Sequence, residues 1–575
     1  MASFTKTHGD DVSLVLCGQA GSGVQTVEHL LVRLLKAAGY HVFATKEYMS
    51  RVRGGLNSTT LRIGSVPVRA NITRIDLLIP LNKGAVEHVR TRLAEKTIIL
   101  CDAEVVDAAE IPQDVRRVDT PLTQLAKTIG NKIYSNIIAV GLVGALFGVD
   151  TTLMAEFIQK RFAKKDKGII DENLRALDAG VKLGEELVAA GTLRFALTPD
   201  PAAAGQMLIS GAEAVGLGAI AGGCNFIGAY PMSPSTELLT FLARQSKPFG
   251  IVVEQAEDEI AGINMALGAW YAGARAIAST SGGGFALMTE GLSLGAMIES
   301  PLVVHIAQRP GPATGLPTRT GQEDLNLALY AGHGEFPRAI FAPGTLWEAF
   351  MLTRLAFDLA DRCQVPVFIL TDQYFVDTYY TTECFDVSQA NIKHRFIESK
   401  EDYKRFSLTE GGVSPRAIPG YGKGLVVVDS DEHDEAGHIT EDLDLRMQMT
   451  NKRLSKQKLL TDQSCGACLW PKRDYKHLVI CWGSTFPIVQ EAIERIGRDD
   501  LSLLHFVQIY PLHPAAAEQI GKAKTRIGLE GNATGQFAQL IQRETGIEMD
   551  EMILKYNGLQ FTVEEVVESL NKIIG

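Results

Sequence analysis

The feature that most constrains the fold is an alternation of short apolar segments with helical patterns beyond residue 205. The apolar segments include Ile251–Val253, Leu302–Ala307 and Pro366–Thr371. Apolar strands of this length that alternate with helices are typical of a parallel sheet covered on both faces. We therefore predict an α/β fold, in which ligands bind where the strands reach their carboxyl ends.

Four parts of the chain differ in pattern, and 575 residues are enough for three or four domains. The first part begins with a strand at Val12–Leu16, a glycine-rich loop and a helix at Val24–Ala38. The segment Thr198–Ala204 is expected to be the linker to the second part. The last part again alternates strand and helix, with a strand at His477–Cys481 and a helix from Pro487. The predicted parts are residues 1–195, 205–375, 376–474 and 475–575.

The third part differs from the others because it has little hydrophobic periodicity and many charges. Structureless loops of this length are unusual in compact domains. We therefore expect residues 376–474 to form an extended arm that lies along another surface.

The charge and hydrophobicity of the chain exclude several classes of partner. The net charge of −11 argues against nucleic acids and anionic membranes. The longest apolar run, Ile137–Gly148, is shorter than the ~18 residues that a membrane-spanning helix needs. The N-terminal residues lack the apolar core of a signal peptide, so we expect a cytoplasmic protein.

The eight cysteines do not have the spacing of a disulfide framework. Only Cys465 and Cys468 are spaced like a metal or redox pair, and a [4Fe–4S] cluster needs four thiolates. We interpret this pair as part of a surface loop, with a zinc or redox role shared with another chain as the alternative. No metal site is therefore predicted in this chain, and any iron–sulfur cluster must come from a partner.

The segment Gly228–Thr236 predicts a ligand site at the end of a strand. A helical pattern at Ala214–Ala221 precedes a short strand at Asn225–Ala229, and a Tyr-Pro pair then takes the chain out of the strand. Ser233 is consequently placed where open α/β sheets bind ligands. The alternative is a loop stiffened by two prolines.

Four carboxylates within Glu254–Ile260 open a predicted helix, where negative charge suits the positive end of the helix dipole. The helix that follows is small and apolar almost all round, so it should be buried. Glu259 enters that interior in the first turn, and a carboxylate there needs a partner. The alternative is that Glu259 is an N-terminal cap.

Eight motifs resemble, in the same order, those of the α-subunit of the 2-oxoacid:ferredoxin oxidoreductases. The motifs are Tyr230–Thr236, Glu257–Gly262, Ser279–Gly284, Gln308–Thr318, Gln322–Asp324, Gly412–Gly420, Asp431–Gly437 and Glu530–Gln536. The resemblance spans nearly the whole chain. It is strongest to the type in which a γ-subunit is fused ahead of α, as in 2-oxoglutarate:ferredoxin oxidoreductase.

The resemblance implies a role for each part of the chain. Residues 1–195 would be the γ domain, which is of the pyruvate/ketoisovalerate oxidoreductase type and is associated with coenzyme A. Residues 205–375 would be the parallel-sheet domain that binds the pyrimidine of thiamine diphosphate. Residues 475–575 would resemble the C-terminal domain of transketolase.

Thiamine diphosphate accepts the carbanion equivalent that remains when a 2-oxoacid is cleaved beside its carbonyl. The cofactor loses its C2 proton only from the imino tautomer, which requires a carboxylate at the pyrimidine N1′. The resemblance gives this role to Glu259. Tyr230, Pro231 and Asp324 are also expected at the cofactor, and Asp324 would brace the loop after Arg309.

Arg309 ends an apolar strand, where a guanidinium can hold a carboxylate through two parallel bonds. The resemblance assigns it the 2-oxoacid carboxylate, assisted by the hydroxyl of Ser233, where the family commonly has threonine. Thr318 and Arg319 are also expected at the substrate, because a second cation favours a dicarboxylate such as 2-oxoglutarate over pyruvate. Arg319 could instead pair with Glu323 as a structural clip.

The loop Gly18–Gly23 lies between a strand and a helix, where backbone amides and the helix dipole suit a phosphate. Its spacing is not that of the dinucleotide fingerprint. Arg51 and Arg53 add two cations, and the resemblance implies that this domain helps enclose coenzyme A. The alternatives are that the glycines serve only the packing of strand and helix, that Arg51 and Arg53 form a solvated basic turn, and that Asn136 is a helix cap. The residues expected to contact coenzyme A are Gly21, Gly23, Arg51 and Asn136.

Thiamine enzymes hold Mg²⁺ at the diphosphate through a Gly-Asp-Gly stretch followed by asparagine, and the sequence has no Gly-Asp-Gly. The resemblance therefore implies a β-subunit that carries Mg²⁺, the diphosphate half of the cofactor and a [4Fe–4S] cluster. The chain should be inactive without it. Ferredoxin is the expected electron partner, and the expected assembly is a dimer of αβ heterodimers.

The expected reaction is the reversible, coenzyme A-dependent oxidative decarboxylation of 2-oxoglutarate to succinyl-CoA and CO₂, with reduction of ferredoxin. The reverse direction would fix CO₂, as in a reductive TCA cycle, and the sequence does not decide the direction. One alternative is the same chemistry on pyruvate, branched-chain or aryl 2-oxoacids. The other is a non-catalytic assembly or regulatory subunit, which the presence of Glu259 and Arg309 disfavours.

Overall fold

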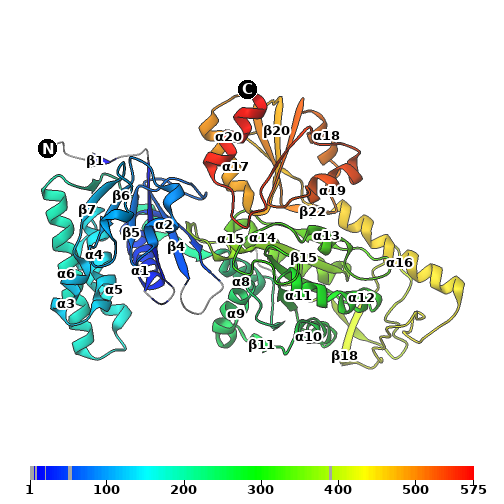
Figure 1. The fold of residues 1–575 in the computed structure, drawn as a ribbon. Coiled ribbons are helices and arrows are strands. Elements are labelled where there is room, and N and C mark those ends of the chain that lie inside the picture. The colour runs from blue at the N-terminus through cyan, green and yellow to red at the C-terminus, as the bar shows by residue number, and fades with distance from the viewer. Residues whose placement is uncertain (1–4, 7–9, 20, 22, 50–54, 388–391) are drawn as a thin grey trace. The chain divides into compact units, whose positions relative to one another are not determined.

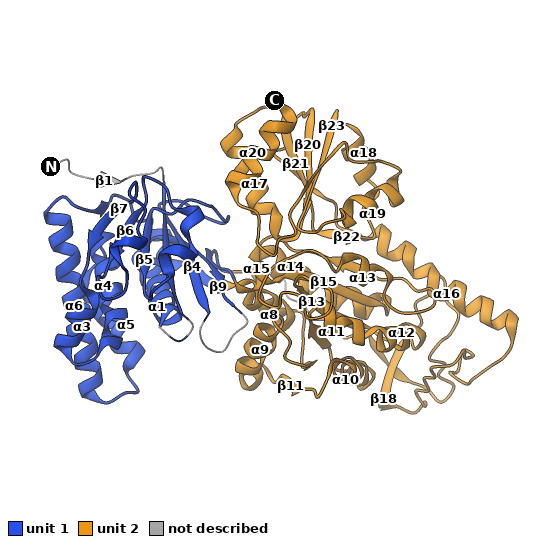
Figure 2. Ribbon diagram, in the orientation of Figure 1, with its two compact units in different colours: residues 1–209, 378–384 blue, residues 210–377, 385–575 orange. Residues whose placement is uncertain are grey.

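The structure is a computed structural model that describes residues 5–6, 10–19, 21, 23–49, 55–387 and 392–575 (Figure 1). The chain forms two compact units, residues 1–209 with 378–384 and residues 210–377 with 385–575 (Figure 2). The predicted linker Thr198–Ala204 lies within the first unit, where Asp200 accepts a hydrogen bond from His41 (3.0 Å) and caps α7 (Pro201–Gly205). No helix in the described ranges is long and apolar enough to cross a membrane.

The first unit is built on an eight-stranded mixed sheet with the order β7-β6-β5-β2-β4-β3-β16-β9. Alternate residues of β2 enter two apolar clusters, so the sheet is covered on both faces. The predicted first strand and helix are confirmed by β2 and α1 (Val24–Ala37). The strands are β2 (Asp11–Gln19), β3 (His41–Glu47), β4 (Leu56–Gly64), β5 (Leu77–Pro80), β6 (Ile98–Cys101), β7 (Arg116–Asp119), β9 (Met207–Ser210) and β16 (Tyr379–Thr382). The larger cluster also contains α4 (Ser135–Leu146), α5 (Thr151–Phe162) and α6 (Lys167–Ala189).

The second unit contains a seven-stranded sheet with the order β11-β10-β12-β13-β15-β14-β22. All pairs are parallel except β14 with β22, and β12, β13 and β15 are buried along their whole length. The predicted parallel sheet is therefore confirmed. Its strands are β10 (Phe226–Ala229), β11 (Val252–Gln255), β12 (Ala276–Thr280), β13 (Leu302–Gln308), β14 (Ala339–Phe341), β15 (Pro366–Asp372) and β22 (Gln508–Tyr510).

Helices on this sheet begin at side chains that satisfy their free amides. Helices α8 and α14 start with capping boxes at Ser210 and Thr345, and they pack against each other. The predicted helix at Ala214–Ala221 is confirmed as part of α8. The helices are α8 (Gly211–Ala221), α9 (Thr236–Phe249), α10 (Glu259–Tyr271), α11 (Gly282–Leu287), α12 (Thr289–Met297), α13 (Leu325–Tyr330) and α14 (Leu346–Cys363).

The C-terminal part forms a five-stranded sheet with the order β19-β21-β20-β23-β24, parallel except for β19. The predicted strand at His477–Cys481 and helix from Pro487 correspond to β20 and α17. The strands are β19 (Cys468–Trp470), β20 (His477–Trp482), β21 (Leu501–Phe506), β23 (Thr525–Glu530) and β24 (Glu551–Leu554). The helices are α17 (Phe486–Ile496), α18 (Ala516–Gly521), α19 (Gln536–Thr545) and α20 (Val563–Ile574).

The segment expected to be an extended arm contains a helix of 20 residues, α16 (Leu443–Asp462), besides β17 (Phe396–Ser399) and β18 (Arg416–Gly422). The buried face of α16 includes Lys452 and Lys456, one helical turn apart. Hydrophobic periodicity did not predict this helix because charged side chains occupy part of its buried face.

Glu299 explains why these lysines are buried. Its two carboxylate oxygens accept hydrogen bonds from Lys452 Nζ and Lys456 Nζ, both at 2.5 Å, and its side chain is 1% exposed. Burial would raise the pKa of Glu299, but Lys456 and Lys452 lower it to about 2. Removing one partner of a buried ion pair is strongly destabilising, since the other charge remains without water or a countercharge.

The substitution Glu299→Gln should lower the free energy of unfolding at pH 7 by about 3–5 kcal/mol, measured by urea denaturation. Because the folded-state pKa is depressed, this stabilisation is complete above the ordinary pKa of 4.5 and disappears as the pH falls through about 2. Asp462→Asn is the control, because it breaks an exposed pair with Lys458 on the same helix. It should cost less than about 0.5 kcal/mol. A loss for Glu299→Gln no larger than the control's would contradict this account of α16.

Candidate active site

Loops from several parallel strands meet at the carboxyl edge of the seven-stranded sheet. The chain passes from β10 to β11 on one side and then to β12 on the other side of β10, so the strand order reverses there. Open α/β sheets bind ligands at such a switch point. The motif Tyr230–Thr236 runs from the end of β10 to the start of α9, the motif Ser279–Gly284 runs from the end of β12 into α11, and the loop after β13 contains Arg309.

Glu259 is the first residue of α10 and is only 3% exposed. The side chain that caps the helix is that of Asp258, which accepts a hydrogen bond from the Ala261 amide at 2.7 Å. Oε1 of Glu259 is buried and has no hydrogen-bond partner among the described residues. Burial raises the pKa of Glu259, and Asp258 adds to the rise. The capping role proposed as the alternative for Glu259 thus belongs to its neighbour.

The glycines after β12 allow the site's carboxyl groups to lie against the backbone. A Cβ atom at Gly284 would lie 2.5 Å from Oε1 of Glu259, and one at Gly282 would lie 2.1 Å from Oδ1 of Asp324. The hydroxyls of Thr280 and Ser281 are buried and have no partner within the described part of the chain. Neither hydroxyl was predicted to belong to the site, although a glycine triplet directly after a strand is a signal for one.

Arg309 follows β13 and lies near both carboxyl groups. Its Nη1 donates to the backbone oxygen of Ser233 at 2.6 Å, and its buried Nε has no partner among the residues described. Burial lowers the pKa of Arg309, whereas Asp324 and Glu259 raise it. The structure therefore brings together Ser233, Glu259, Arg309 and Asp324, although the exposed Ser233 contacts Arg309 through its backbone.

Asp324 is held at the end of β13, because its amide donates to Oε1 of Gln308 at 3.0 Å. Its Oδ2 is buried without a partner in the described ranges. Burial, with a smaller contribution from Glu323, raises the pKa of Asp324 to about 7, although Arg309 opposes the shift. A carboxyl of this kind exchanges a proton near neutral pH.

The C-terminal motif Glu530–Gln536 positions this loop. The backbone amide of Gln322 donates to Gly531 O at 2.7 Å. In return, the backbone amide of Gly531 donates to Oε1 of Gln322 at 2.8 Å. Asn532 Nδ2 donates to Gln322 O at 3.1 Å, and Gln536 Nε2 donates to Glu323 O at 2.8 Å. Two motifs more than 200 residues apart in sequence thus form one hydrogen-bonded unit.

The remaining residues predicted in this unit lie around the same loops. Tyr230 is exposed, whereas Pro231 is half-buried. Thr318 and Arg319 are half-buried, and a Cβ atom at Gly558 would lie 3.1 Å from Cβ of Arg319. The stem of Arg319 therefore packs against the loop of the C-terminal part that contains Gly558.

In the first unit, Gly21 and Gly23 have positive φ, and Gly23 precedes the first residue of α1. A Cβ atom at Gly23 would lie 2.0 Å from Nδ2 of Asn136, the second residue of α4. The structure therefore brings Gly23 and Asn136 together. Arg51 and Arg53 lie outside the described residues.

Comparison with known proteins decides the family. Residues 217–452 match the family described as pyruvate flavodoxin/ferredoxin oxidoreductase, thiamine diP-bdg, and residues 13–183 match that described as pyruvate ferredoxin/flavodoxin oxidoreductase. The 2-oxoacid:ferredoxin oxidoreductase subunit alpha of Sulfolobus sp is 31% identical over 625 residues, covering 98% of this chain and 97% of that protein. The chain belongs to the 2-oxoacid:ferredoxin oxidoreductase α-subunit family. The predicted family, its oxidoreductase class and the α/β fold with a thiamine diphosphate-binding domain are confirmed.

Two other members of the family are similar to this chain. The solved 2-oxoglutarate:ferredoxin oxidoreductase from Magnetococcus marinus, with 2-oxoglutarate, coenzyme A and succinyl-CoA bound, has a TM-score of 0.91 and 29% identity. The similarity covers 99% of this chain and 100% of that chain. The 2-oxoglutarate synthase subunit KorA of Archaeoglobus fulgidus is 45% identical over 166 residues, which are 29% of this chain and 48% of that protein.

The substitution Asp324→Asn should stabilise the ligand-free, full-length chain at high pH. Since the folded-state pKa of about 7 exceeds the ordinary 3.8, the stability that depends on neutral Asp324 is complete below pH 3.8 and is lost as the pH rises through 7. We expect the variant to be more stable than the parent by about 2–4 kcal/mol at pH 8 and to lose that part of the pH dependence.

Thermal unfolding of both proteins between pH 4 and pH 8 measures this effect. The control is Asp358→Asn, which removes the partner of Arg395 at a half-exposed site and should give no such gain. Parallel pH profiles for Asp324→Asn and the parent would show that Asp324 is ionised throughout.

Proposed function

We propose that this chain is the α-subunit of a 2-oxoglutarate:ferredoxin oxidoreductase and binds the pyrimidine half of thiamine diphosphate together with the 2-oxoacid. The supporting observation is the buried carboxyl of Glu259, which has an unpartnered Oε1 in the described structure and lies near Arg309 at the switch point of the sheet. The reaction would be the reversible oxidative decarboxylation of 2-oxoglutarate to succinyl-CoA and CO₂, with reduction of ferredoxin.

The polar groups of the site fit an aminopyrimidine. Glu259 would accept and return a proton at N1′, since its raised pKa lets Oε1 share a proton with a ring nitrogen. The hydroxyls of Thr280 and Ser281, which no described residue bonds, would hydrogen-bond the amino group or ring edge. Tyr230 and Pro231 would line the same side after β10. When bound, thiamine diphosphate supplies the electron sink that carbon–carbon cleavage requires.

Arg309 would hold the carboxylate next to the reacting carbonyl. Its Nη1 is engaged by Ser233 O, which fixes the orientation of the guanidinium, while its Nε has no partner among the described residues. Asp324, with its pKa of about 7, would hold a proton near the substrate in its neutral form and attract Arg309 once it has released that proton. Ser233 would assist through its hydroxyl, which is exposed on the same loop.

The choice of 2-oxoglutarate rests on Arg319 and on two relatives. Thr318 and Arg319 would meet the distal carboxylate, since a second cation suits a dicarboxylate. The Magnetococcus marinus enzyme contains 2-oxoglutarate, and the Archaeoglobus fulgidus relative is named a 2-oxoglutarate synthase subunit. The Sulfolobus relative is named only for 2-oxoacids, so pyruvate, branched-chain and aryl 2-oxoacids are the competing substrates.

The first unit would bind coenzyme A as the acyl acceptor. Gly21 and Gly23 allow a close approach to the start of α1, and Asn136 lies against Gly23 at the start of α4. Amides at helix N-termini suit phosphate groups. Arg51 would supply a cation there, and the Magnetococcus marinus enzyme contains coenzyme A and succinyl-CoA.

The complete enzyme would require a β-subunit. That subunit would provide Mg²⁺ and the diphosphate site, for which this sequence has no Gly-Asp-Gly stretch, and a [4Fe–4S] cluster that reduces ferredoxin. The relatives named as α-subunits support a multi-subunit assembly, which we expect to be a cytoplasmic dimer of αβ heterodimers. The four-part division, with a γ domain at 1–195 and a transketolase C-terminal-like domain at 475–575, is part of the same proposal.

The substitution Glu259→Gln in the αβ complex should lower turnover by about 10²–10⁴-fold, because an amide cannot exchange the proton. The assay uses 2-oxoglutarate, coenzyme A and a viologen dye, with pyruvate as the competing substrate. Glu257→Gln is the matched control, since Glu257 is exposed on the same loop. Near-parental turnover of Glu259→Gln would mean that Glu259 has no role in cofactor activation.

Substitutions of Arg309 and Arg319 distinguish recognition of the carboxylate that all 2-oxoacids share from recognition of the distal carboxylate of 2-oxoglutarate. Arg309→Lys should lower kcat/KM about ten- to a hundredfold for every 2-oxoacid, because the fork of the guanidinium becomes a point charge. Arg319→Ala should raise KM for 2-oxoglutarate more than for 2-oxobutyrate, which lacks the distal carboxylate. An equal effect of Arg319→Ala on both substrates would remove Arg319 from the pocket.

A further inference from the structure

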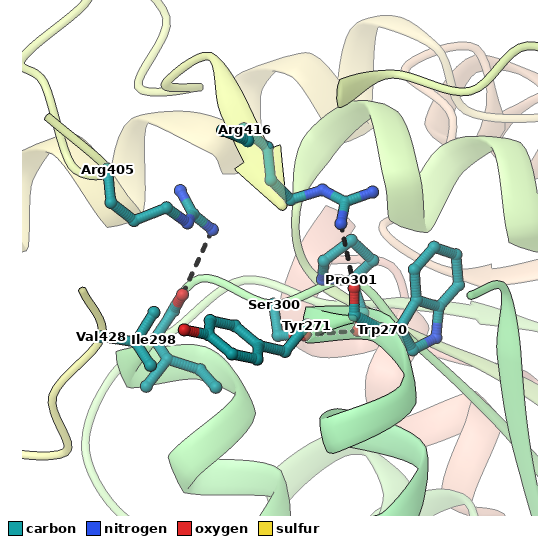
Figure 3. A pocket seen from close by; sticks show the side chains of 9 residues that line it. Trp270, Tyr271, Ile298, Ser300, Pro301, Arg405, Arg416 and Val428 are labelled. Carbon is teal, nitrogen blue, oxygen red and sulfur yellow. Dashed lines mark hydrogen bonds between the residues drawn. The ribbon is translucent and has the colours of Figure 1, made fainter. Parts of the chain in front are cut away.

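Two of the family motifs, Gly412–Gly420 and Asp431–Gly437, lie in the segment 376–474. Arg416 of the first motif and Arg405 line a cavity of about 20 Å³ at the last turn of α10. Figure 3 shows the guanidinium of Arg416 bonded to the backbone oxygen of Trp270 at the end of that helix, and the guanidinium of Arg405 bonded to the backbone oxygen of Ile298. The other wall is the segment 298–301 that follows α12.

Both arginines carry a buried donor that no described residue accepts. Arg405 is 3% exposed and donates Nη2 to the backbone oxygens of Ile298 (3.3 Å) and Glu299 (2.7 Å), but its Nη1 has no partner. Arg416 is 5% exposed and donates Nη1 to Trp270 O (3.0 Å). Its Nη2 bonds Asp361 Oδ1 at 2.7 Å, whereas its Nε has no partner.

The charges that described residues bury around this cavity do not balance. The buried cations linked by these contacts are Arg275, Arg405, Arg416, Lys452 and Lys456, and the carboxylates that they share are Glu299 and Asp361. Burial lowers the pKa of Arg405, Glu299 and Tyr403 oppose this shift, and Arg416 adds to it. Burial, together with Lys456 and Arg405, also lowers the pKa of Lys452 to about 8, although Glu299 opposes this. Excess buried charge of one sign is costly unless a countercharge compensates it.

We propose that the cavity between Arg405 and Arg416 binds a monovalent inorganic anion of the size of chloride. A site for one water needs about 10–15 Å³, so the cavity admits one small sphere but not a phosphate or an organic acid. A water molecule in the cavity would leave the excess positive charge uncompensated. A bound anion would accept hydrogen bonds from the unpartnered donors and would also compensate the excess positive charge. It would join the segment 376–474 to the end of α10, the helix that begins at Glu259.

The first test is thermal unfolding of the full-length chain in sodium chloride and in sodium gluconate at equal ionic strength. Binding to the folded state alone gives a saturable rise of the unfolding temperature. We expect this rise with chloride and bromide and not with gluconate, whose anion is too large for the cavity. Equal responses to chloride and gluconate would contradict the proposal.

The variant Arg405→Lys keeps the charge but loses the forked donors. The chloride concentration that gives half of the temperature shift should rise at least tenfold. The control is Arg395→Lys, which changes a half-exposed arginine of the same segment and should leave the chloride response as in the parent. An unchanged response in Arg405→Lys would place the anion elsewhere.

Diffraction from crystals grown in bromide tests the site without any substitution. An anomalous peak between the guanidinium groups of Arg405 and Arg416 is the expected result, and its height should fall when chloride is added in excess. A water molecule with no anomalous signal at that position would overturn the proposal, even if Arg405→Lys did not fold.

Discussion

Parallel pairing of β10, β12, β13 and β15 is the constraint on which the rest of this structure depends. Because these strands run in one direction, all their following loops lie at one edge, and loops far apart in sequence become neighbours. The strands are short and apolar, so they are stable only when helices cover both faces. The hydrogen bonds of Gln322 with Gly531 and Asn532 then attach the C-terminal part beside the same edge. The candidate active site is a consequence of this arrangement.

The site contains polar atoms that folding removes from water and that have no partner in the part of the chain that the structure describes, namely Glu259 Oε1, Arg309 Nε and Asp324 Oδ2. Glu259 and Asp324 have raised pKa values because of burial, and Arg309 has a lowered one for the same reason. Such groups cost folding free energy, and clusters of them are typical of functional sites. Gly282 and Gly284 make the cluster denser, because any side chain there would displace the two carboxyl groups. A ligand that pairs with these groups would therefore bind to a site already formed.

Charge has a different role in residues 376–474. There, buried lysines and arginines contact Glu299 and Asp361, and among the described residues the positive charge exceeds the negative charge. Helix α16 depends on this electrostatic contact as well as on apolar packing. The family motif around Arg416 lies at the end of α10 and not at the edge of the sheet that carries Glu259. Some motifs of the family thus form the candidate active site, whereas the motif around Arg416 attaches the segment 376–474 to the end of α10.

The sequence by itself determined the family, the α/β fold and the positions of several strands and helices, because short apolar strands, helix caps and ordered motifs are local signals. It also identified Glu259, Arg309 and Asp324 as candidates, since charged residues at strand ends or helix starts stand out from apolar surroundings. It did not predict α16, because a helix whose buried face carries charges has no hydrophobic period. Nor did it reveal the roles of Thr280, Ser281 and Gln322. Only the tertiary structure decided these, since burial, the loss of hydrogen-bond partners and contacts across more than 200 residues exist only once the strands have paired and the C-terminal part has docked.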